Sequence, residues 1–443
     1  FAPVDDFEVS ITENYPDEPQ TWRVLLDDEF QAKLKIVKKD DETGMPVLVP
    51  GAEFKIYDLD QEVYVEQVTT YPTTTVHTSF FTDENGYLIL PENLDAGRYR
   101  IEEVTAPEGY TVNGETVEIA VDSNMAYQID PVSKDLVIEV EVENHPVKGE
   151  LTVTKVGELL TGYEEDFLYD SSSLEGAVFE VYAAEDIYTP DHQKDENGNR
   201  IVIYEEGTLV ATLTTDETGS AEIENLPLGA YRVAEKEAPE GFVKDTALQE
   251  VVFTYVDQDT PIVEQAVHFE NERQKVSLTV IKQNAETNAE VEGAVFGLYN
   301  TEDIISDSGE LFVKADTLLQ EMISDENGKA SCTLDLPLGQ YYVKELKAPA
   351  GFVSSEEVLT FDASYQGQDV QTIKLEQIKK NQPTTVEVTK TDLTTGTELD
   401  GAMLTVLDQD GNVVDEWTSV KDKPHVIKCL AVGETYTLRE DFA

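Results

Sequence analysis

The sequence has 443 residues, which predicts roughly three or four domains rather than one core. Its 91 aspartate and glutamate residues outnumber 31 lysine and arginine residues, and the formal net charge of −60 disfavours nucleic acid and anionic lipid as partners. Hydrophobic residues still make up 40% of the chain, so we expect a folded protein rather than a disordered acidic tail.

Residues 1–30 come before the first repeated segment. They contain the Glu-Asn-x-Pro pattern around Asn14 but no first strand ahead of it. We interpret 1–30 as the tail or last strand of a preceding domain, and Phe1 as an internal or processed start.

A repeat of about a hundred residues dominates the rest of the chain. Each unit has an alternating strand, a Gly-Ala turn and another strand, as in "LTVTKVGE" before "EGAVFEVY". The period is too long for a solenoid and is typical of separate all-β sandwiches. We predict tandem immunoglobulin-like sandwiches in an extended string, at residues 31–147, 148–274, 275–383 and, incomplete, 384–443.

Four acidic segments predict hairpin turns. "TDENGYLIL", "DENGNRIVI", "SDENGKASC" and "DQDGNVV" place Asn-Gly or Asp-Gly between apolar alternations, which is typical of a two-residue turn. In the last segment, Asp408, Asp410 and Asn412 resemble part of a calcium loop. No acidic residue completes the twelve-residue spacing, so we expect turns and no metal.

Enzyme and membrane motifs are missing from this sequence. It contains no nucleophile elbow, P-loop or dinucleotide fingerprint, and its five histidines lack metal-ligand spacing. No apolar run approaches the roughly 18 residues of a membrane span. We therefore expect no enzyme, no cofactor and no membrane span in this fragment.

Strand alternation places a polar residue at the end of several apolar faces. Lysine ends the first strand of every repeat, glutamate ends the strand in the "LPLGAYRVAEKEAPEGF" type of segment, and asparagine ends the last strand of the first two repeats. The lysines are Lys38, Lys155, Lys282 and Lys390, the glutamates are Glu103, Glu235, Glu345 and Glu440, and the asparagines are Asn144 and Asn271.

Two interpretations explain these residues. The first is a buried lysine–glutamate ion pair capped by an amide, or strand ends that reach solvent. The second is chemical: desolvation lowers the pKa of a lysine and raises that of a glutamate, which makes the neutral amine and the protonated acid accessible. The amine can then attack the amide carbonyl while the acid moves protons to the leaving ammonia, giving an isopeptide bond. Four recurrences at matching parity favour the second interpretation.

A family resemblance rests on "VTK", "GAVFEVY", "LPLGAYRVAEKEAPEGF" and "HFENE". With these segments, roughly residues 31–443 resemble the collagen-adhesin B-type, SpaA-like (prealbumin-like) domains of Gram-positive surface proteins and pilins. The resemblance implies an immunoglobulin-like sandwich whose first and last strands are cross-linked beside a catalytic acid. The pairs that it implies are Lys38–Asn144 with Glu103, and Lys155–Asn271 with Glu235.

The last two repeats depart from that pattern. In the third, Gln377 stands where asparagine is expected, but "KNQP" offers Asn381, which follows Glu345 at the 36-residue separation found in the second repeat. We expect Asn381 as the partner of Lys282 and keep Gln377 as the alternative. In the fourth repeat, the lysine and the glutamate have no amide partner within the sequence.

The resemblance implies a structural role outside the cell. We expect a stalk segment of a cell-wall-anchored adhesin, joined to peptidoglycan through a sorting signal outside this fragment, with a host or cell ligand that the sequence does not identify. An ancillary or shaft pilin is the alternative, although no "YPKN"-like pilin lysine motif occurs. A ligand-binding module is a further alternative, with its candidate loops in the second-repeat insertions 157–173 and 183–207.

The short linkers near 146–150, 272–276 and 381–385 predict an elongated particle, because each last strand runs almost directly into the next first strand. A compact chain of this length would have a radius of gyration of about 22 Å. Small-angle scattering should give a clearly larger value together with the signature of a folded chain. A near-spherical particle would contradict the extended string.

Overall fold

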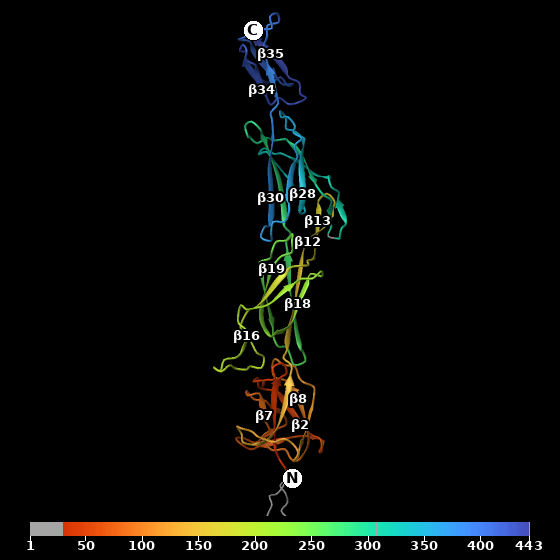
Figure 1. Ribbon diagram of the computed structural model, residues 1–443, viewed down its shortest axis with the longest axis vertical. Helices are drawn as coiled ribbons and strands as arrows, with labels where there is room; N and C mark the ends of the chain where they lie inside the picture. The colour runs from red at the N-terminus through yellow and green to blue at the C-terminus, as the bar shows by residue number, and fades with distance from the viewer. Residues whose placement is uncertain (1–29, 307, 443) are drawn as a thin grey trace, which may run out of the picture. The chain divides into compact units, whose positions relative to one another are not determined.

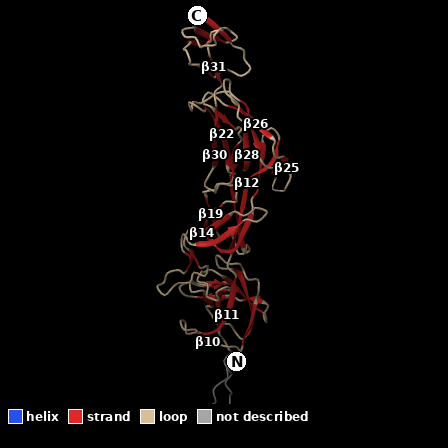
Figure 2. Ribbon diagram, turned by 45° about the horizontal axis from the view of Figure 1, so that its top comes forward, coloured by secondary structure: helices blue, strands red, loops and turns tan. Residues whose placement is uncertain are grey.

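The computed structural model describes residues 30–306 and 308–442 (Figure 1). Asn14 and residues 1–29 of the segment that we assign to a preceding domain lie outside these residues, and Phe30 packs against the core of the first repeat. The described residues form strands and loops and contain no helix, so none could cross a membrane as a helix (Figure 2). The prediction of an all-β chain of tandem repeats is confirmed.

The first repeat is a two-sheet sandwich. One sheet has the strand order β10-β11-β1-β7, and the other has the order β3-β2-β8-β9 with β6 also paired to β2. A hairpin, β4–β5, stands apart from both sheets. The strands are β1 (Lys33–Asp40), β2 (Glu53–Asp58), β3 (Val63–Tyr64), β4 (Gln67–Thr69), β5 (Thr75–His77), β6 (Phe80–Phe81), β7 (Tyr87–Ile89), β8 (Gly97–Thr105), β9 (Val117–Val121), β10 (Gln128–Ile129) and β11 (Leu136–Asn144).

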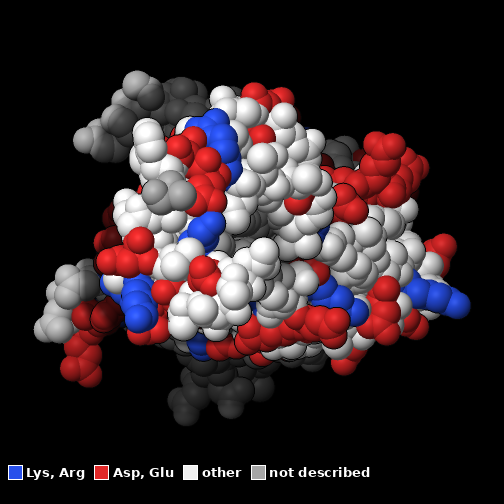
Figure 3. Space-filling view, turned by 90° about the horizontal axis from the view of Figure 1, so that it is seen from above, with Lys and Arg blue, Asp and Glu red and all other residues white. Residues whose placement is uncertain are grey.

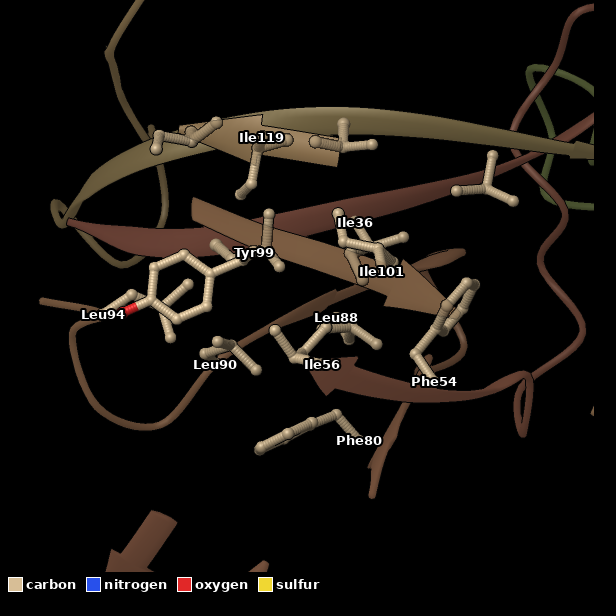
Figure 4. Packing of buried hydrophobic residues seen from close by; sticks show 14 of the residues in the cluster. Ile36, Phe54, Ile56, Phe80, Leu88, Leu90, Leu94, Tyr99, Ile101 and Ile119 are labelled. Atoms are coloured by element: carbon tan, nitrogen blue, oxygen red, sulfur yellow. The ribbon is translucent and has the colours of Figure 1, made fainter. Parts of the chain in front are cut away.

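The core of this sandwich follows from strict alternation along the strands. In β1 every second residue is buried, beginning with Leu34 and Ile36, and these side chains meet Phe54, Tyr99 and Ile101 of the facing sheet (Figure 4). Burial of each such side chain contributes about 1.5–3 kcal/mol. The same alternation directs Lys38 and Asp40 inward at the end of the strand.

The second repeat has the strand order β17-β14-β19-β20 in one sheet and β13-β12-β18, with β21 paired to β12, in the other. Its strands are β12 (Lys148–Tyr163), β13 (Phe167–Ser173), β14 (Val178–Ala183), β15 (Ile187–Tyr188), β16 (Val202–Tyr204), β17 (Leu209–Thr214), β18 (Ser220–Pro227), β19 (Gly229–Glu237), β20 (Leu248–Phe253) and β21 (Ile262–Asn271).

The third repeat has sheets ordered β27-β22-β30 and β26-β23-β28-β29, and the fourth has β31-β34 and β33-β32-β35. The strands of the third are β22 (Lys275–Asn284), β23 (Val295–Asn300), β24 (Ile304–Ile305), β25 (Leu311–Val313), β26 (Leu318–Ile323), β27 (Lys329–Ser331), β28 (Gly339–Lys347), β29 (Leu359–Ala363) and β30 (Thr372–Asn381). Those of the fourth are β31 (Thr385–Val388), β32 (Met403–Leu407), β33 (Val413–Thr418), β34 (His425–Lys428) and β35 (Thr437–Phe442).

Contacts divide the chain into two units. The first contains the first repeat and most of the second. The second unit consists of Lys155–Leu174, Glu237–Asp245 and the chain from Glu270 onward. The division therefore passes through the second repeat.

On the face seen in Figure 3, acidic side chains outnumber basic ones, in keeping with the net charge of −60.

The acidic turns are one residue longer than predicted. The Asp83 N–H bonds to the Tyr87 carbonyl, the Gly86 N–H bonds to the Asp83 carbonyl, and Gly86 has a φ of 79°. This three-residue loop is favoured because the aspartate carboxylate accepts the N–H of Asn85 within the turn. In the same way, the Asp408 carboxylate accepts the N–H groups of residues 410 and 412, and these hydrogen bonds stabilise the turn.

A capping side chain turns the chain after the first strand in three repeats. In the first repeat, Asp40 Oδ1 accepts the N–H groups of Glu42 and Thr43, each at 2.9 Å. Asn284 and Asp392 cap the corresponding turns of the third and fourth repeats. These caps turn the chain away from the strand two residues after the lysine.

Gly157 occupies the capping position in the second repeat and has no side chain to form the turn. The strand β12 continues to Tyr163 and returns as β13. A Cβ atom on Gly157 would lie 2.6 Å from a Leu174 methyl carbon and 2.7 Å from the Phe242 ring. Close packing thus requires glycine at this position. Because glycine has no side chain to cap the turn, the strand can also continue past it.

The insertion 157–173 is this hairpin, and its aromatic residues pack into the third repeat. Phe167 is 4% exposed and belongs to the same core cluster as Leu278. Tyr169 donates its hydroxyl to the Asp335 carbonyl at 3.0 Å, and the Arg273 guanidinium lies 3.6 Å from the Tyr169 ring centre. Tyr169 is therefore a packing residue at this position.

The insertion 183–207 contacts the first repeat. The Leu48 N–H donates to the Asp191 carbonyl at 2.8 Å, and Gln193 Nε2 donates to the Pro46 carbonyl at 2.6 Å. Both insertions of the second repeat therefore pack against a neighbouring repeat.

The buried hydroxyl of Tyr110 provides a stability test. It donates to Asp40 Oδ2 at 2.8 Å, and both residues are 0% exposed. Tyr110→Phe should lower the free energy of unfolding of the first repeat by about 1.5–3 kcal/mol, because a buried carboxylate loses a hydrogen bond. Urea unfolding followed by hydrogen exchange of β1 measures this change.

Tyr64→Phe is the matched control. Its hydroxyl also donates to a carboxylate, Glu102 Oε2 at 2.9 Å, but Tyr64 is 46% exposed. We expect a change within about 0.5 kcal/mol. Equal losses in the two variants would show that burial does not determine the strength of the Tyr110 bond.

Candidate functional site

Parallel pairing of the first and last strands brings the predicted lysine and asparagine to one face. In the first repeat β1 runs parallel to β11, with Lys38 opposite Val142 and Asp40 opposite Asn144. Because alternate side chains share a face, Lys38 and Asn144 point to the same side, one step apart along the ladder. The predicted glutamate comes from the facing sheet, where Glu103 lies opposite Phe54.

The three side chains of the first repeat meet in the core. Lys38 Nζ lies 3.1 Å from Glu103 Oε1, and Asn144 Nδ2 donates to Glu103 Oε2 at 3.0 Å. The side chains of Lys38 and Glu103 are 0% exposed, and Asn144 is 2% exposed. The carboxylate thus bridges the amine and the amide nitrogen.

The segment after the Ala-Pro-x-Gly loop orients this site. The Asn113 N–H donates to Glu103 Oε2 at 3.0 Å, and Asn144 Nδ2 also donates to the Thr111 carbonyl. One segment therefore holds both the acid and the amide. The pattern of side chains in the sequence did not reveal these two backbone groups. Only their spacing from the Ala-Pro-x-Gly loop could have indicated them.

The third repeat reproduces the arrangement with Asn381. Asn381 Nδ2 donates to Glu345 Oε1 at 2.8 Å and to Oε2 at 2.7 Å, while Lys282 Nζ lies 4.0 Å from Glu345 Oε1. The Ser355 N–H donates to Glu345 Oε2 at 2.9 Å. Gln377 instead donates to the Thr360 carbonyl at 2.6 Å. The structure places Asn381, and not Gln377, beside the acid.

In the second repeat the lysine contacts the amide oxygen. Lys155 Nζ donates to Asn271 Oδ1, and the two residues are 0% and 1% exposed. Glu235 is 3% exposed on β19, at the position that corresponds to the acids of the first and third repeats. All three predicted residues of this repeat are therefore buried.

The fourth repeat differs in burial. Lys390 Nζ lies 2.6 Å from Glu440 Oε2, but their side chains are 28% and 34% exposed. Val386 and Leu438, which parity predicts to face inward, are 41% and 52% exposed. Among the described residues β31 pairs only with β34, so its other edge is uncovered. The result is a partly exposed ion pair, a type that contributes little to stability.

Burial shifts the acid–base balance of the two lysines toward the neutral amine. Desolvation lowers the pKa of Lys38 to about 8, although nearby Glu103 opposes the shift. Desolvation also lowers the pKa of Lys282 to about 8, with Glu345 opposing it and the positive charge of Lys379 adding to it. A substantial fraction of each amine is then neutral near pH 8.

Lys379 is a buried residue that the sequence pattern missed. It lies opposite Lys282, where the first repeat has Val142, and it is 1% exposed. Its Nζ donates to Glu357 Oε2 at 2.9 Å and to the Glu357 carbonyl at 2.8 Å. Lys379 is two residues before Asn381 on the same strand, so strand alternation could have predicted that it faces the core.

Within residues 30–306 and 308–442, no group of three or more His, Cys, Asp or Glu side chains could hold a metal ion.

Several solved structures are similar to this chain. The TIE protein of Bacillus anthracis is 23% identical with a TM-score of 0.49, and the match covers 79% of this chain and 50% of that one, so this chain spans about half its length. BcpA, the major pilin subunit of Bacillus cereus, is 16% identical with a TM-score of 0.31, and the match covers 80% of this chain and all of BcpA (100%). The shaft pilin SpaA of Lactobacillus rhamnosus GG is 18% identical with a TM-score of 0.21, covering 54% of this chain and 98% of that one.

A search of curated proteins finds no match. The family model of the SpaA prealbumin-like fold domain matches residues 32–135, 169–267, 276–379 and 384–443. These matches fall on all four repeats and cover most of the chain. The chain therefore belongs to the family of SpaA prealbumin-like fold domains.

Proposed function

We propose that this chain is a structural stalk segment of a cell-wall-anchored bacterial surface adhesin, in which three repeats close their own lysine–asparagine isopeptide bonds. The bonds are Lys38–Asn144, Lys155–Asn271 and Lys282–Asn381. The observation that carries the proposal is the buried carboxylate of Glu103 between the amine and the amide nitrogen of the first repeat. The acids of the other two bonds are Glu235 and Glu345.

The first repeat illustrates the reaction. Neutral Lys38 Nζ adds to Cγ of Asn144, and the amide oxygen takes up the electron pair. The Glu103 carboxyl group, whose oxygens lie 3.1 Å from Nζ and 3.0 Å from Nδ2, takes up the proton that Nζ releases and delivers a proton to Nδ2. The Cγ–Nδ2 bond breaks and ammonia leaves. An amine and a primary amide become a secondary amide and ammonia, and the acid is regenerated.

Unpaired buried atoms support this chemistry over a permanent ion pair. Asn144 Oδ1 and Asn381 Oδ1 are buried without a hydrogen-bond partner. Lys38 Nζ and Glu103 Oε1 lie at ion-pair distance but make no directed hydrogen bond. Each unsatisfied buried group costs about 1–3 kcal/mol. Bond formation removes the buried amine charge from this site, which relieves part of that cost.

The position of each bond suits a chain under tension. The bond joins the first and last strands of a repeat, which run parallel in the described first and third repeats. Tension that enters at one strand leaves through the other, so the 105 residues between Lys38 and Asn144 carry no load. Closing such a loop also contributes about 4–5 kcal/mol through the unfolded state, by analogy with disulfides.

The cellular setting follows from the family. SpaA-like domains occur in Gram-positive surface proteins and pilins, so we place the chain outside the cell, attached to peptidoglycan through a sorting signal beyond this sequence. A pilus subunit is the second candidate, because the family includes pilins. Covalent polymers on the cell surface that contain this chain would favour that candidate over a single anchored stalk.

Asn381→Ala provides a direct test of the third bond. The protein without substitutions should weigh about 51 Da less than its encoded mass, because each of the three bonds releases one ammonia of about 17 Da. Asn381→Ala should remove one of these losses, whereas Gln377→Ala, four residues away on the same strand, should keep all three. Intact mass spectrometry measures the difference. An unmodified protein at its full encoded mass would exclude all three bonds.

Glu235→Ala separates the catalytic role of the acid from a structural one. If Glu235 transfers protons, the variant should fold but retain one ammonia, with Lys155 and Asn271 recovered in separate tryptic peptides. If Glu235 is only half of an ion pair, the variant should lose about 3–5 kcal/mol of unfolding free energy and keep the same mass deficit. Peptide mapping and thermal unfolding measure these two outcomes.

Glu237→Ala is the control, because Glu237 lies on the same strand but is exposed. It should retain the cross-link and the thermal stability. A cross-linked Lys155–Asn271 peptide from Glu235→Ala would leave Glu235 with a structural role only.

A further inference from the structure

The Ala-Pro-x-Gly-aromatic loop recurs at residues 106–110, 238–242 and 348–352. Each copy follows the strand that carries the buried glutamate. The aromatic residue closes each loop, but cross-linking does not explain why alanine and proline precede it in every copy. The hydrogen bonds of the first two loops indicate a second role for this segment.

A glutamine of the second repeat binds the loop of the first. Gln258 Oε1 accepts the Ala106 N–H at 3.0 Å, and the Gln258 main-chain carbonyl accepts the Val112 N–H at 3.1 Å. Gln258 Nε2 also lies 3.4 Å from the Val104 carbonyl, to which it donates. All of these residues belong to the first unit.

A glutamine of the third repeat makes the same pair of bonds to the loop of the second. Gln368 Oε1 accepts the Ala238 N–H at 2.9 Å, and the Gln368 main-chain carbonyl accepts the Lys244 N–H at 2.9 Å. These residues all belong to the second unit. The two N–H groups are six residues apart in both loops, and each glutamine comes three residues after a tyrosine.

We propose that the Ala-Pro-x-Gly loop of one repeat is a docking site whose partner is the Tyr-x-x-Gln loop of the next repeat. The docking sites are residues 104–112 and 238–244, and the residues that bind them are Gln258 and Gln368. Two independent copies of one bonding pattern carry the proposal, and it does not depend on the isopeptide bonds.

Glutamine suits this position for two reasons. Its amide oxygen accepts the alanine N–H while its amide nitrogen donates to a loop carbonyl, so one side chain satisfies both kinds of backbone group. It is also neutral. A glutamate would add negative charge between repeats of a chain with a net charge of −60 and could not donate to the Val104 carbonyl.

The two insertions of the second repeat reinforce these contacts but do not replace them. Insertion 183–207 bonds to Leu48 and Pro46 of the first repeat, and insertion 157–173 packs against Arg273 and Asp335. The two sets of contacts differ completely from each other. The glutamine contacts are the part that the two junctions share.

Hydrogen–deuterium exchange of the full chain, resolved by peptide mass spectrometry, tests the proposal. Gln258→Ala should speed exchange of the Ala106 amide, which loses its side-chain acceptor, by about tenfold or more and leave the Ala238 amide unchanged. Gln368→Ala should do the reverse. Because both glutamines are partly exposed loop residues, we expect both variants to fold and to keep the mass of the cross-linked chain, corrected for the substitution.

Gln249→Ala is the matched control. Gln249 also lies in the second repeat, and its amide bonds to a main-chain carbonyl, that of His268, within its own repeat. It should leave both docking loops unchanged. Unchanged exchange of the two loops in both docking variants would overturn the proposal, and so would equal acceleration of both loops by either variant, which indicates general destabilisation.

Discussion

The parallel pairing of first and last strands is the constraint on which the rest of each sandwich depends. It places β1 beside β11 and β22 beside β30, so the two ends of a repeat meet in one sheet. Parallel strands cannot be joined by a tight turn, and all other strands of the repeat must therefore be formed between them. The same register places a lysine and an asparagine on one inward face. The parallel pairing of the first and last strands thus accounts both for the strand order and for the meeting of the lysine and the asparagine.

Burying a lysine and a glutamate in that core is costly, and the sites of the first and third repeats share two features. The acids are held from behind by backbone N–H groups, of Asn113 in the first repeat and Ser355 in the third. Desolvation lowers the pKa of Lys38 and Lys282 to about 8. Where the core is open, as around Lys390 and Glu440, the same residue types form an ordinary partly exposed ion pair. Burial thus distinguishes the sites of the first and third repeats from this surface contact.

The repeats differ where they meet their neighbours. In the first repeat Asp40 caps a turn and accepts the Tyr110 hydroxyl. In the second, Gly157 and Phe242 occupy the corresponding positions, the cap is lost, and the strand extends into a hairpin that packs on the third repeat. One residue two places after the lysine therefore decides whether the chain turns back or reaches the next core.

The sequence by itself determined the all-β class, the four repeats and the inward parity of Lys38, Glu103 and Asn144, because side-chain direction along a strand is a local property of period two. Only the tertiary structure placed Asn381, and not Gln377, beside Glu345, showed that the Lys390–Glu440 pair is partly exposed, and showed that the two insertions pack against neighbouring repeats. These outcomes depend on which strands pair, in which register, and which sheet edges are covered. Such non-local relations leave no periodic signal in the chain.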